Sequence, residues 1–269
     1  MVNIAIAGIG GRMGRAMAAI IAAGQSDYNL AAGFEFAEHP ALGQELNAFL
    51  GLPGLTGRLE VISPELLAGA DVLLDFTRPA GSMQHLDICA RAGKAVVLGT
   101  TGFSAEQKTI ISDYAGRIPL VFASNYSVAM NLMFQLVGEM AAILGSDYAL
   151  EVIEAHHDQK VDAPSGTAWT LLEALAKARN LDLDKACRHG RHGMVGPRAV
   201  DEIGVSVIRG GDIVGEHTVM FIGQGERLDL SHRVQTRDTF AQGAIRAAAW
   251  LVGKGVGLYD MKDVLGLKD

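Results

Sequence analysis

The sequence has little that would support a disulfide framework or a basic binding surface. Its 269 residues include two cysteines, Cys89 and Cys187, whose positions show no metal-binding or redox spacing. Such sparse cysteine usage indicates a reducing compartment. Lys and Arg number 23 against 30 Asp and Glu, a formal net charge of −7. This balance argues against nucleic acid or an anionic membrane as the main partner, because both require a basic footprint.

Long hydrophobic runs, internal repeats and low-complexity tracts are lacking as well. We expect no segment to reach the roughly 20 apolar residues that cross a bilayer. The N-terminus enters a strand pattern directly, without the charged, apolar and cleavage regions of a signal peptide. Hydrophobic residues nevertheless make up 49% of the chain, which is ample material for a core. We therefore expect a soluble cytoplasmic protein, in which Cys89 is a small apolar residue inside a helix.

Strand and helix patterns alternate through the first half of the chain. The apolar run Val2–Ala7 precedes a cluster of glycines, and apolar residues at helical spacing then continue to a stop at Gly24. Further strands are expected at 30–34, 70–77, 95–98 and 118–123, with helices at 79–93 and after the capping box at 104–107. Repeated β-α-β units predict a Rossmann-like, doubly wound parallel sheet with helices on both faces.

The pattern changes after Ser127. Helices are expected near 132–144, 168–175 (capped by Ser165 or Thr167) and 239–252, and strands at 149–155, 204–209, 214–222 and 227–235. The polar, glycine-bearing stretch 182–201 is expected to form a mobile loop. We therefore predict an α/β protein with a dinucleotide-binding domain at 1–127, a second α+β domain built on a mixed sheet at 128–237, and a C-terminal helix at 238–269 that returns to the first domain.

The glycine cluster lies between a strand and a helix, as a dinucleotide-binding loop does. Residues 8–14 read Gly-Ile-Gly-Gly-Arg-Met-Gly; Met13 occupies the last glycine position of the strict G-x-G-x-x-G pattern, so the spacing is G-x-x-G-x-x-G. Glycine there lets the backbone turn sharply and approach a pyrophosphate at the helix start. Glu35 follows 21 residues after Gly14, where an acidic group binds a ribose hydroxyl. The alternative is a tight turn without a ligand.

The residues around Glu35 bear on the choice of cofactor. Phe36 follows it, whereas binding of NADPH usually calls for a cation near the 2′-phosphate, which a glutamate repels. We therefore predict that NADH is accepted at least as well as NADPH, although Arg12 or Arg15 could partly compensate.

Residues 154–168 concentrate acid–base groups beside a predicted helix start. Histidine gives and takes protons near neutrality, and lysine supplies a cation whose pKa falls when it is desolvated. The backbone amides of Pro-Ser-Gly-Thr at a helix start attract carboxylate or phosphate. This combination indicates proton transfer to a small anionic molecule. Three alternatives compete: histidines pointing to opposite faces of a strand, a metal site that includes both histidines and Asp158, and ordinary solvated charges at Lys160 and Asp162.

Six motifs in order carry a resemblance to a known family. They are Gly-Ile-Gly-Gly-Arg-Met-Gly at 8–14, Asp-Phe-Thr-Arg-Pro at 75–79, Gly-Thr-Thr-Gly-Phe at 99–103, Asn-Tyr-Ser at 125–127, the segment His-His-x-x-Lys-x-Asp-Ala-Pro-Ser-Gly-Thr at 156–167, and Arg-Gly-Gly-Asp-Ile-Val-Gly-Glu-His at 209–217. Together they resemble the 4-hydroxy-tetrahydrodipicolinate (dihydrodipicolinate) reductases of bacterial and plant lysine biosynthesis, over nearly the whole chain. The resemblance implies hydride transfer from NAD(P)H to a cyclic dicarboxylate made from aspartate semialdehyde and pyruvate, in the diaminopimelate route.

The resemblance also implies roles for individual residues. His156 would be the proton donor or acceptor and Lys160 the second proton donor. The substrate would be held by His157, Ser165, Gly166 and Thr167. The cofactor would be lined by Gly8, Ile9, Gly10, Gly11, Arg12, Met13, Glu35, Arg78, Gly99, Thr100, Thr101, Ala123, Ser124, Asn125 and Tyr126. No metal is expected. A homotetramer built through the sheet of the second domain is implied, as is closure about hinges near Ser127 and Thr236.

The chemistry of the residues agrees with this resemblance. Hydride addition to a conjugated imine leaves an atom that needs a proton, and a positioned acid lowers that barrier. A lysine cation stabilises developing negative charge, and amides at a helix start suit a carboxylate. Two other functions stay open: a reductase of the same architecture for another imino or oxo acid, and a nicotinamide-binding sensor without turnover, which would have no need of proton donors.

Overall fold

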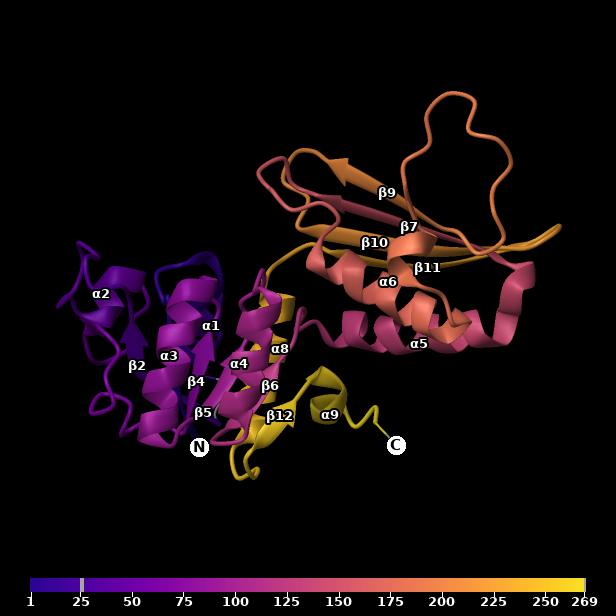
Figure 1. The fold of residues 1–269 in the computed structure, drawn as a ribbon. Helices are drawn as coiled ribbons and strands as arrows, with labels where there is room; N and C mark the ends of the chain where they lie inside the picture. Colours follow the sequence, from indigo (N-terminus) through magenta and orange to yellow (C-terminus); the bar gives the residue numbers. More distant parts are fainter. Residues whose placement is uncertain (25–26, 269) are drawn as a thin grey trace. The chain divides into compact units, whose positions relative to one another are not determined.

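The computed structural model describes residues 1–24 and 27–268, which form two compact units (Figure 1). One unit consists of Met1–Val128 together with Arg237–Asp269, and the other of Ala129–Thr236. The chain therefore leaves the first unit once, builds the second, and returns.

The first unit is built on a seven-stranded sheet in which every strand pair is parallel. Its order is β12-β6-β5-β4-β1-β2-β3, so the direction of winding reverses between β1 and β4. The strands are β1 (Val2–Ala7), β2 (Tyr28–Phe34), β3 (Leu59–Glu60), β4 (Val72–Asp75), β5 (Ala95–Leu98), β6 (Pro119–Phe122) and β12 (Gly257–Tyr259).

Helices cover both faces of this sheet. Ile4 and Ile6 of β1 are buried in one core with side chains of α1 (Arg12–Ala22), α8 (Asp238–Leu251) and α9 (Met261–Leu265). Ala5 and Ala7, which alternate with them, lie in a second core under α3 (Pro79–Ala92) and α4 (Ala105–Ala115). This alternation follows from the two-residue period of a strand. The predicted doubly wound sheet is confirmed.

Several local predictions are also confirmed in this unit. Ser104 begins α4 with a capping box, in which its hydroxyl accepts from the Gln107 amide and its own amide donates to the Gln107 side chain. Cys89 lies fully buried inside α3, and burial raises the pKa of its thiol to about 12. The sequence patterns missed α2 (Leu46–Leu50), β3, β12 and α9, each of two to five residues. Segments this short do not complete a recognisable period.

The second unit is a mixed five-stranded sheet with helices on one face. Its order is β11-β10-β7-β9-β8; β7, β8 and β9 run parallel, and β10 is antiparallel to β7 and β11. The strands are β7 (Ala149–His156), β8 (Cys187–His189), β9 (Ile203–Arg209), β10 (Gly215–Ile222) and β11 (Arg227–Val234). The helices α5 (Val128–Leu144) and α6 (Gly166–Arg179) lie along one face of this sheet (Figure 1). Their apolar side chains are buried against it, and the 3-10 turn Gly145–Asp147 follows α5. The predicted mixed sheet is confirmed.

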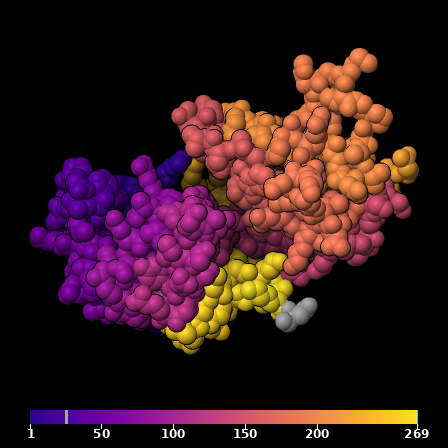
Figure 2. All heavy atoms as spheres, viewed as in Figure 1, coloured from indigo at the N-terminus to yellow at the C-terminus, as the bar shows by residue number. Residues whose placement is uncertain are grey.

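The expectation of an irregular loop at 182–201 is partly wrong. This stretch holds the short helix α7 (Leu183–Ala186) and then β8, which pairs in parallel with β9. Pairing with a distant strand is a tertiary interaction that leaves no local pattern in three residues. Residues 190–201 are mostly exposed and project from this unit (Figure 2). Arg191 and Arg198 nevertheless tie the segment to Glu151 of β7, at 2.8 and 3.2 Å.

The expectation that no segment is long and apolar enough to cross a membrane also needs correction. Residues Val128–Asp147 meet that test by length and composition, with 20 residues and a mean hydropathy of 1.5. The scattered polar residues of this stretch interrupt every apolar run, so counting uninterrupted runs missed it. The core helix of a soluble protein passes the same test. Six side chains of α5 are in fact buried, most of them in the core of the second unit.

Candidate active site

The residues predicted to hold the cofactor gather at one edge of the first sheet. They follow β1, β2, β4, β5 and β6, and the carboxyl ends of parallel strands meet at the same edge. The loops after β1 and β4 flank the point where the winding reverses, which is where open α/β sheets bind ligands. These two loops touch: a Cβ atom on Gly8 would lie 2.8 Å from the Thr77 methyl carbon.

The glycine loop is shaped for a close backbone approach. Gly8 has a left-handed φ of 66°, and Gly11 caps the N-terminus of α1. A Cβ on Gly14 would lie 2.5 Å from the Cα of Ile9, so only glycine lets α1 pack this tightly on the loop. The Gly10 amide donates to Oε1 of Glu35 at 2.8 Å, which joins the loop to the end of β2. The loop is therefore held close to β2 and α1 in a conformation that requires glycine.

A buried aspartate supports the neighbouring loops, and the sequence reasoning did not single it out. Asp75 at the end of β4 is fully buried. It accepts hydrogen bonds from the Thr77 amide at 3.0 Å and the Thr77 hydroxyl at 2.6 Å, and it pairs with His85 at 2.8 Å. Ser82 donates to the Thr100 hydroxyl at 2.8 Å, which brings the loop after β5 into the same network.

At several of the predicted cofactor residues the side chain is buried or absent, so only the backbone could contact a cofactor. The ring of Tyr126 is buried, and its hydroxyl donates to the Leu98 carbonyl at 2.9 Å. The side chain of Ile9 belongs to the core, and a Cβ on Gly99 would collide with the Phe76 ring. Arg12, Arg78, Thr101 and Ser124 are exposed; Met13, Glu35, Ala123 and Asn125 are half-buried.

Two arginines, Arg12 and Arg15, lie at or just after the glycine loop. Among the ion pairs of the described residues, neither has a carboxylate partner. Arg15 donates from Nε to the Gly10 carbonyl at 2.9 Å, and its guanidinium stacks 5.0 Å from the Phe49 ring centre. Arg12 is the first residue of α1, and Arg237 is the N-cap of α8. Burial of Arg237 lowers its pKa, and the nearby charge of Arg12 lowers it further. Arg237 was not among the predicted site residues, because the cluster forms only when α8 packs beside α1.

In the second unit, a fully buried carboxylate contacts the predicted proton donor. Glu154 and His156 lie two residues apart on β7 and therefore on one face. His156 Nδ1 is 2.5 Å from Glu154 Oε2. Arg209, which is opposite His156 in the register of β7 and β9, reaches both oxygens of Glu154 at 2.9 Å. Burial alone would raise the pKa of Glu154, but the hydrogen bonds from His156, Arg209 and the Ser165 amide lower it to about 2.

The predicted anion-binding segment is the start of α6. Ser165 is its N-cap, and its hydroxyl accepts from the Ala168 amide at 3.1 Å; of the two candidate caps, Ser165 is therefore the one used. Gly166 and Thr167 form the first turn. The Ser165 amide donates to Glu154 Oε1 at 3.0 Å, so one carboxylate holds both His156 and this helix start.

A second buried histidine lies beside the first. His217 of β10 is 3% exposed, its ring centre is 5.2 Å from that of His156, and its Nε2 is 3.2 Å from the Ser165 hydroxyl. Burial, followed by the charge of His156, lowers the pKa of His217 to about 3. His217 is therefore neutral at physiological pH.

The other two predicted residues of this segment follow β7. The His157 amide donates to the Ile213 carbonyl at 2.8 Å, and its side chain is half-buried. Lys160 pairs with Asp162 at 2.7 Å. Within residues 1–24 and 27–268, no group of three or more His, Cys, Asp or Glu side chains is arranged to hold a metal ion.

The sequence could have supplied part of what was missed. Glu154 alternates with His156 on a predicted strand, which places the two side chains on one face. Arg209 and His217 begin and end the quoted motif at 209–217. Their contacts with residues 154–165 depend on strand pairing, for which the sequence alone gave no register.

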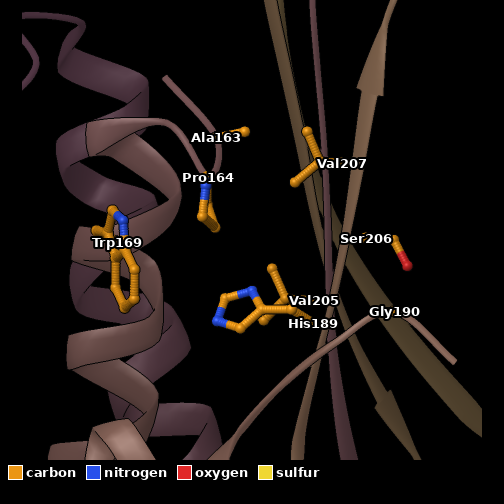
Figure 3. Close-up of a pocket in the computed structure, with 8 residues that line it drawn as sticks. All are labelled: Ala163, Pro164, Trp169, His189, Gly190, Val205, Ser206 and Val207. Atoms are coloured by element: carbon orange, nitrogen blue, oxygen red, sulfur yellow. The ribbon is translucent and has the colours of Figure 1, made fainter. Parts of the chain in front are cut away.

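A pocket of about 600 Å³ lies between the start of α6 and the strands β8 and β9 (Figure 3). Trp169 of α6 and His189 of β8 face it, with ring centres 6.0 Å apart. The lining comprises Ala163, Pro164, Trp169, His189, Gly190, Val205, Ser206 and Val207. Neither predicted proton donor is among these residues.

Comparison with known proteins places the chain in a family. Residues 2–126 match the family model described as dihydrodipicolinate reductase, N-terminus, and residues 129–265 match dihydrodipicolinate reductase, C-terminus. The chain belongs to the dihydrodipicolinate reductase family. The prediction of this family, and of a reductase of its kind, is confirmed.

Relatives within the dihydrodipicolinate reductase family match along their whole length. The 4-hydroxy-tetrahydrodipicolinate reductase of Nitrosomonas eutropha is 49% identical over 100% of this chain and 99% of its own. The enzyme of that name from Geobacter metallireducens is 44% identical, with 100% of both chains covered. A structure described as dipicolinate-bound dihydrodipicolinate reductase from Paenisporosarcina sp. TG-14 superposes with a TM-score of 0.72 at 24% identity, covering 97% of each chain, which supports the shared fold.

Proposed function

We propose that this chain reduces 4-hydroxy-tetrahydrodipicolinate, by way of dihydrodipicolinate, to tetrahydrodipicolinate with NAD(P)H, in the diaminopimelate route of lysine biosynthesis. The observation that carries this function is the full-length match to reductases of that name, in a chain that joins a Rossmann-like unit to one carrying His156 beside a helix start. Within this function, the first unit binds the dinucleotide and the second binds the substrate.

The residues at the carboxyl edge of the first sheet fit a dinucleotide. The glycine loop packs too tightly against Thr77, Phe49 and Ile9 to admit a Cβ, and the helix start that follows it favours a pyrophosphate. Glu35 would accept from a ribose hydroxyl, and the loops after β4, β5 and β6 would surround the remainder. The bound dinucleotide supplies the hydride. NADH would serve at least as well as NADPH, since Glu35 is a carboxylate and the adjoining Phe36 is 59% exposed and uncharged.

The second unit would supply the protons and hold the carboxylates. His156 would give the proton that the reduced ring requires, and Lys160 would be the second donor. The amides at the start of α6, with His157 and Thr167, would bind the substrate carboxylates. Support for a dicarboxylate comes from the Paenisporosarcina relative, which was solved with dipicolinate bound. Hinges near Ser127 and Thr236, beside the two points where the chain passes between units, would allow closure.

We propose a homotetramer that works in the cytoplasm, with the two small molecules and other copies of the chain as its partners. The sheet of the second unit carries both helices on one face, and the register places Ile153, Ile208 and Met220 on the other. Ile208 is 51% exposed there. Sedimentation should give four times the chain mass of 28.4 kDa; a monomer at working concentration would contradict the tetramer.

The activity is tested by following absorbance at the reduced-nicotinamide band with freshly made substrate. Oxidation of NAD(P)H that depends on this substrate and yields tetrahydrodipicolinate is expected. His156→Gln and Lys160→Ala should each lower kcat strongly while the protein stays folded by circular dichroism. Turnover with other imino or oxo acids but not with this one would assign a different substrate. Cofactor binding without any turnover would indicate a sensor.

A further inference from the structure

Glu154 is a buried charge that the proposed reaction does not itself use. Its side chain has no exposed surface, yet its low pKa keeps it ionised. An ionised carboxylate buried without partners would strongly destabilise the fold. Four donors compensate it: two from Arg209, one from the Ser165 amide and one from His156.

The state of Glu154 fixes the tautomer of His156. An ionised carboxylate only accepts hydrogen bonds. Because His156 Nδ1 lies 2.5 Å from Glu154 Oε2, Nδ1 must carry a proton and donate it. The proton that His156 exchanges is therefore the one on Nε2.

The surroundings of Nε2 are consistent with this assignment. A Cβ on Gly215 would lie 3.1 Å from His156 Nε2, so the glycine keeps space open at this nitrogen. The side chain of His156 is 10% exposed, which leaves a narrow approach. His217, the neighbour on β10, is neutral and adds no competing charge.

From this geometry, and resting on the proposed function, we infer that Glu154 is a positioning residue for catalysis. Held by Arg209, it keeps His156 in the Nδ1–H tautomer with Nε2 toward the substrate, and it stabilises the imidazolium that serves as the acid. Because it also holds the Ser165 amide, it fixes the proton donor relative to the helix start that binds the carboxylates.

The test is the pH dependence of kcat in Glu154→Gln, whose side chain has nearly the same shape without the charge. The groups around His156 are Glu154 on its own strand, Arg209 on β9, His217 on β10, and Lys160 with Asp162 in the loop after β7. Glu154→Gln removes the negative charge that contacts the ring. The alkaline limb of the kcat profile should therefore move to lower pH in this variant. On that limb, each unit lowers kcat about tenfold.

Two further variants separate positioning from stability. Glu151→Gln is the matched control: Glu151 lies on the same strand, on the opposite face, and also pairs with arginines. Its pH profile should equal that of the wild type. Glu154→Gln/Arg209→Met removes both charges, so no unpaired arginine stays buried. If Glu154 acts only on stability, this double variant should have the wild-type pH profile of kcat. If Glu154 positions His156, the alkaline limb of that profile should remain at lower pH than in the wild type.

A readout without turnover keeps the inference separate from the proposed function. Nitrogen NMR of ¹⁵N-histidine protein should show neutral His156 protonated at Nδ1 in the wild type and in Glu151→Gln. In Glu154→Gln the signal should change to a mixture of tautomers. An Nε2–H tautomer in the wild type, or an unchanged tautomer and pH profile in Glu154→Gln, would overturn the inference. If the wild type has the Nδ1–H tautomer but does not turn over the substrate, the proposed function is contradicted and the inference about the tautomer is not.

Discussion

The stability of the second unit should depend on pH through Glu154. Its pKa is about 2 in the folded protein, against an ordinary value of 4.5. A carboxyl whose pKa is lowered by folding stabilises the fold when it is ionised. This stabilisation is fully present above about pH 4.5 and is lost as the pH falls toward 2. The difference between the two pKa values corresponds to roughly 3 kcal/mol at pH 7.

Glu154→Gln measures this contribution, because glutamine resembles the protonated carboxyl. The two tryptophans make the assay local: Trp169 lies in α6 of the second unit, and Trp250 in α8 of the first. With Trp250→Phe as the background, urea unfolding followed by fluorescence reports the second unit through Trp169. The variant should be less stable by roughly 3 kcal/mol at pH 7 and by about half of that at pH 3.

The pH dependence is the decisive part of this experiment. A loss that is constant between pH 7 and pH 3 would mean that the side chain acts through shape rather than charge. A loss below about 1 kcal/mol at pH 7 would refute the assigned low pKa. Glu151→Gln should show a smaller loss, since Glu151 and its arginine partners are partly exposed and exposed ion pairs contribute about 0 to 1 kcal/mol.

Three further predictions concern the two predicted binding sites. The ratio of kcat/KM for NADH to that for NADPH should be one or greater, and a strong preference for NADPH would contradict the role given to Glu35. Thr167→Val should raise KM for the substrate more than it lowers kcat; a fall in kcat alone would remove Thr167 from substrate binding. Gly14→Ala should weaken cofactor binding in calorimetry and cost about 1 to 3 kcal/mol of stability, because its methyl group would collide with the glycine loop. Gly69→Ala, at an open position of the same unit, should change neither.

The first unit was predictable because its elements are local and repeated. The strands β1, β4, β5 and β6 are largely buried, mostly apolar runs. The helices α3 and α4 have recognisable starts, at Pro79 and at the capping box of Ser104. The glycine spacing and Glu35 then located the expected cofactor edge. The short elements α2, β3, β12 and α9 escaped because they depend on contacts made after the fold has formed.

The second unit was less predictable for a different reason. Strand β8 is three residues long, and its pairing with β9 defines it. The residues that complete the Glu154–His156 pair, Arg209 and His217, come from β9 and β10, more than 50 residues further along the chain. Arg209 and His217 belong to the motif at 209–217, but no local sequence pattern predicts that they lie beside Glu154.

Strand register is therefore what assembles the predicted proton-transfer site. Arg209 stands opposite His156 in the β7–β9 pair, and His217 stands opposite Glu154 in the β7–β10 pair. A shift of one residue in either pair would turn these side chains to the other face of the sheet. The apolar side chains prevent such a shift: Val152 of β7, Val205 of β9 and Val219 of β10 share the buried face with this network. Burial of the core and alignment of the acid–base groups thus depend on the same register, so a strand that packs correctly also places its part of the site.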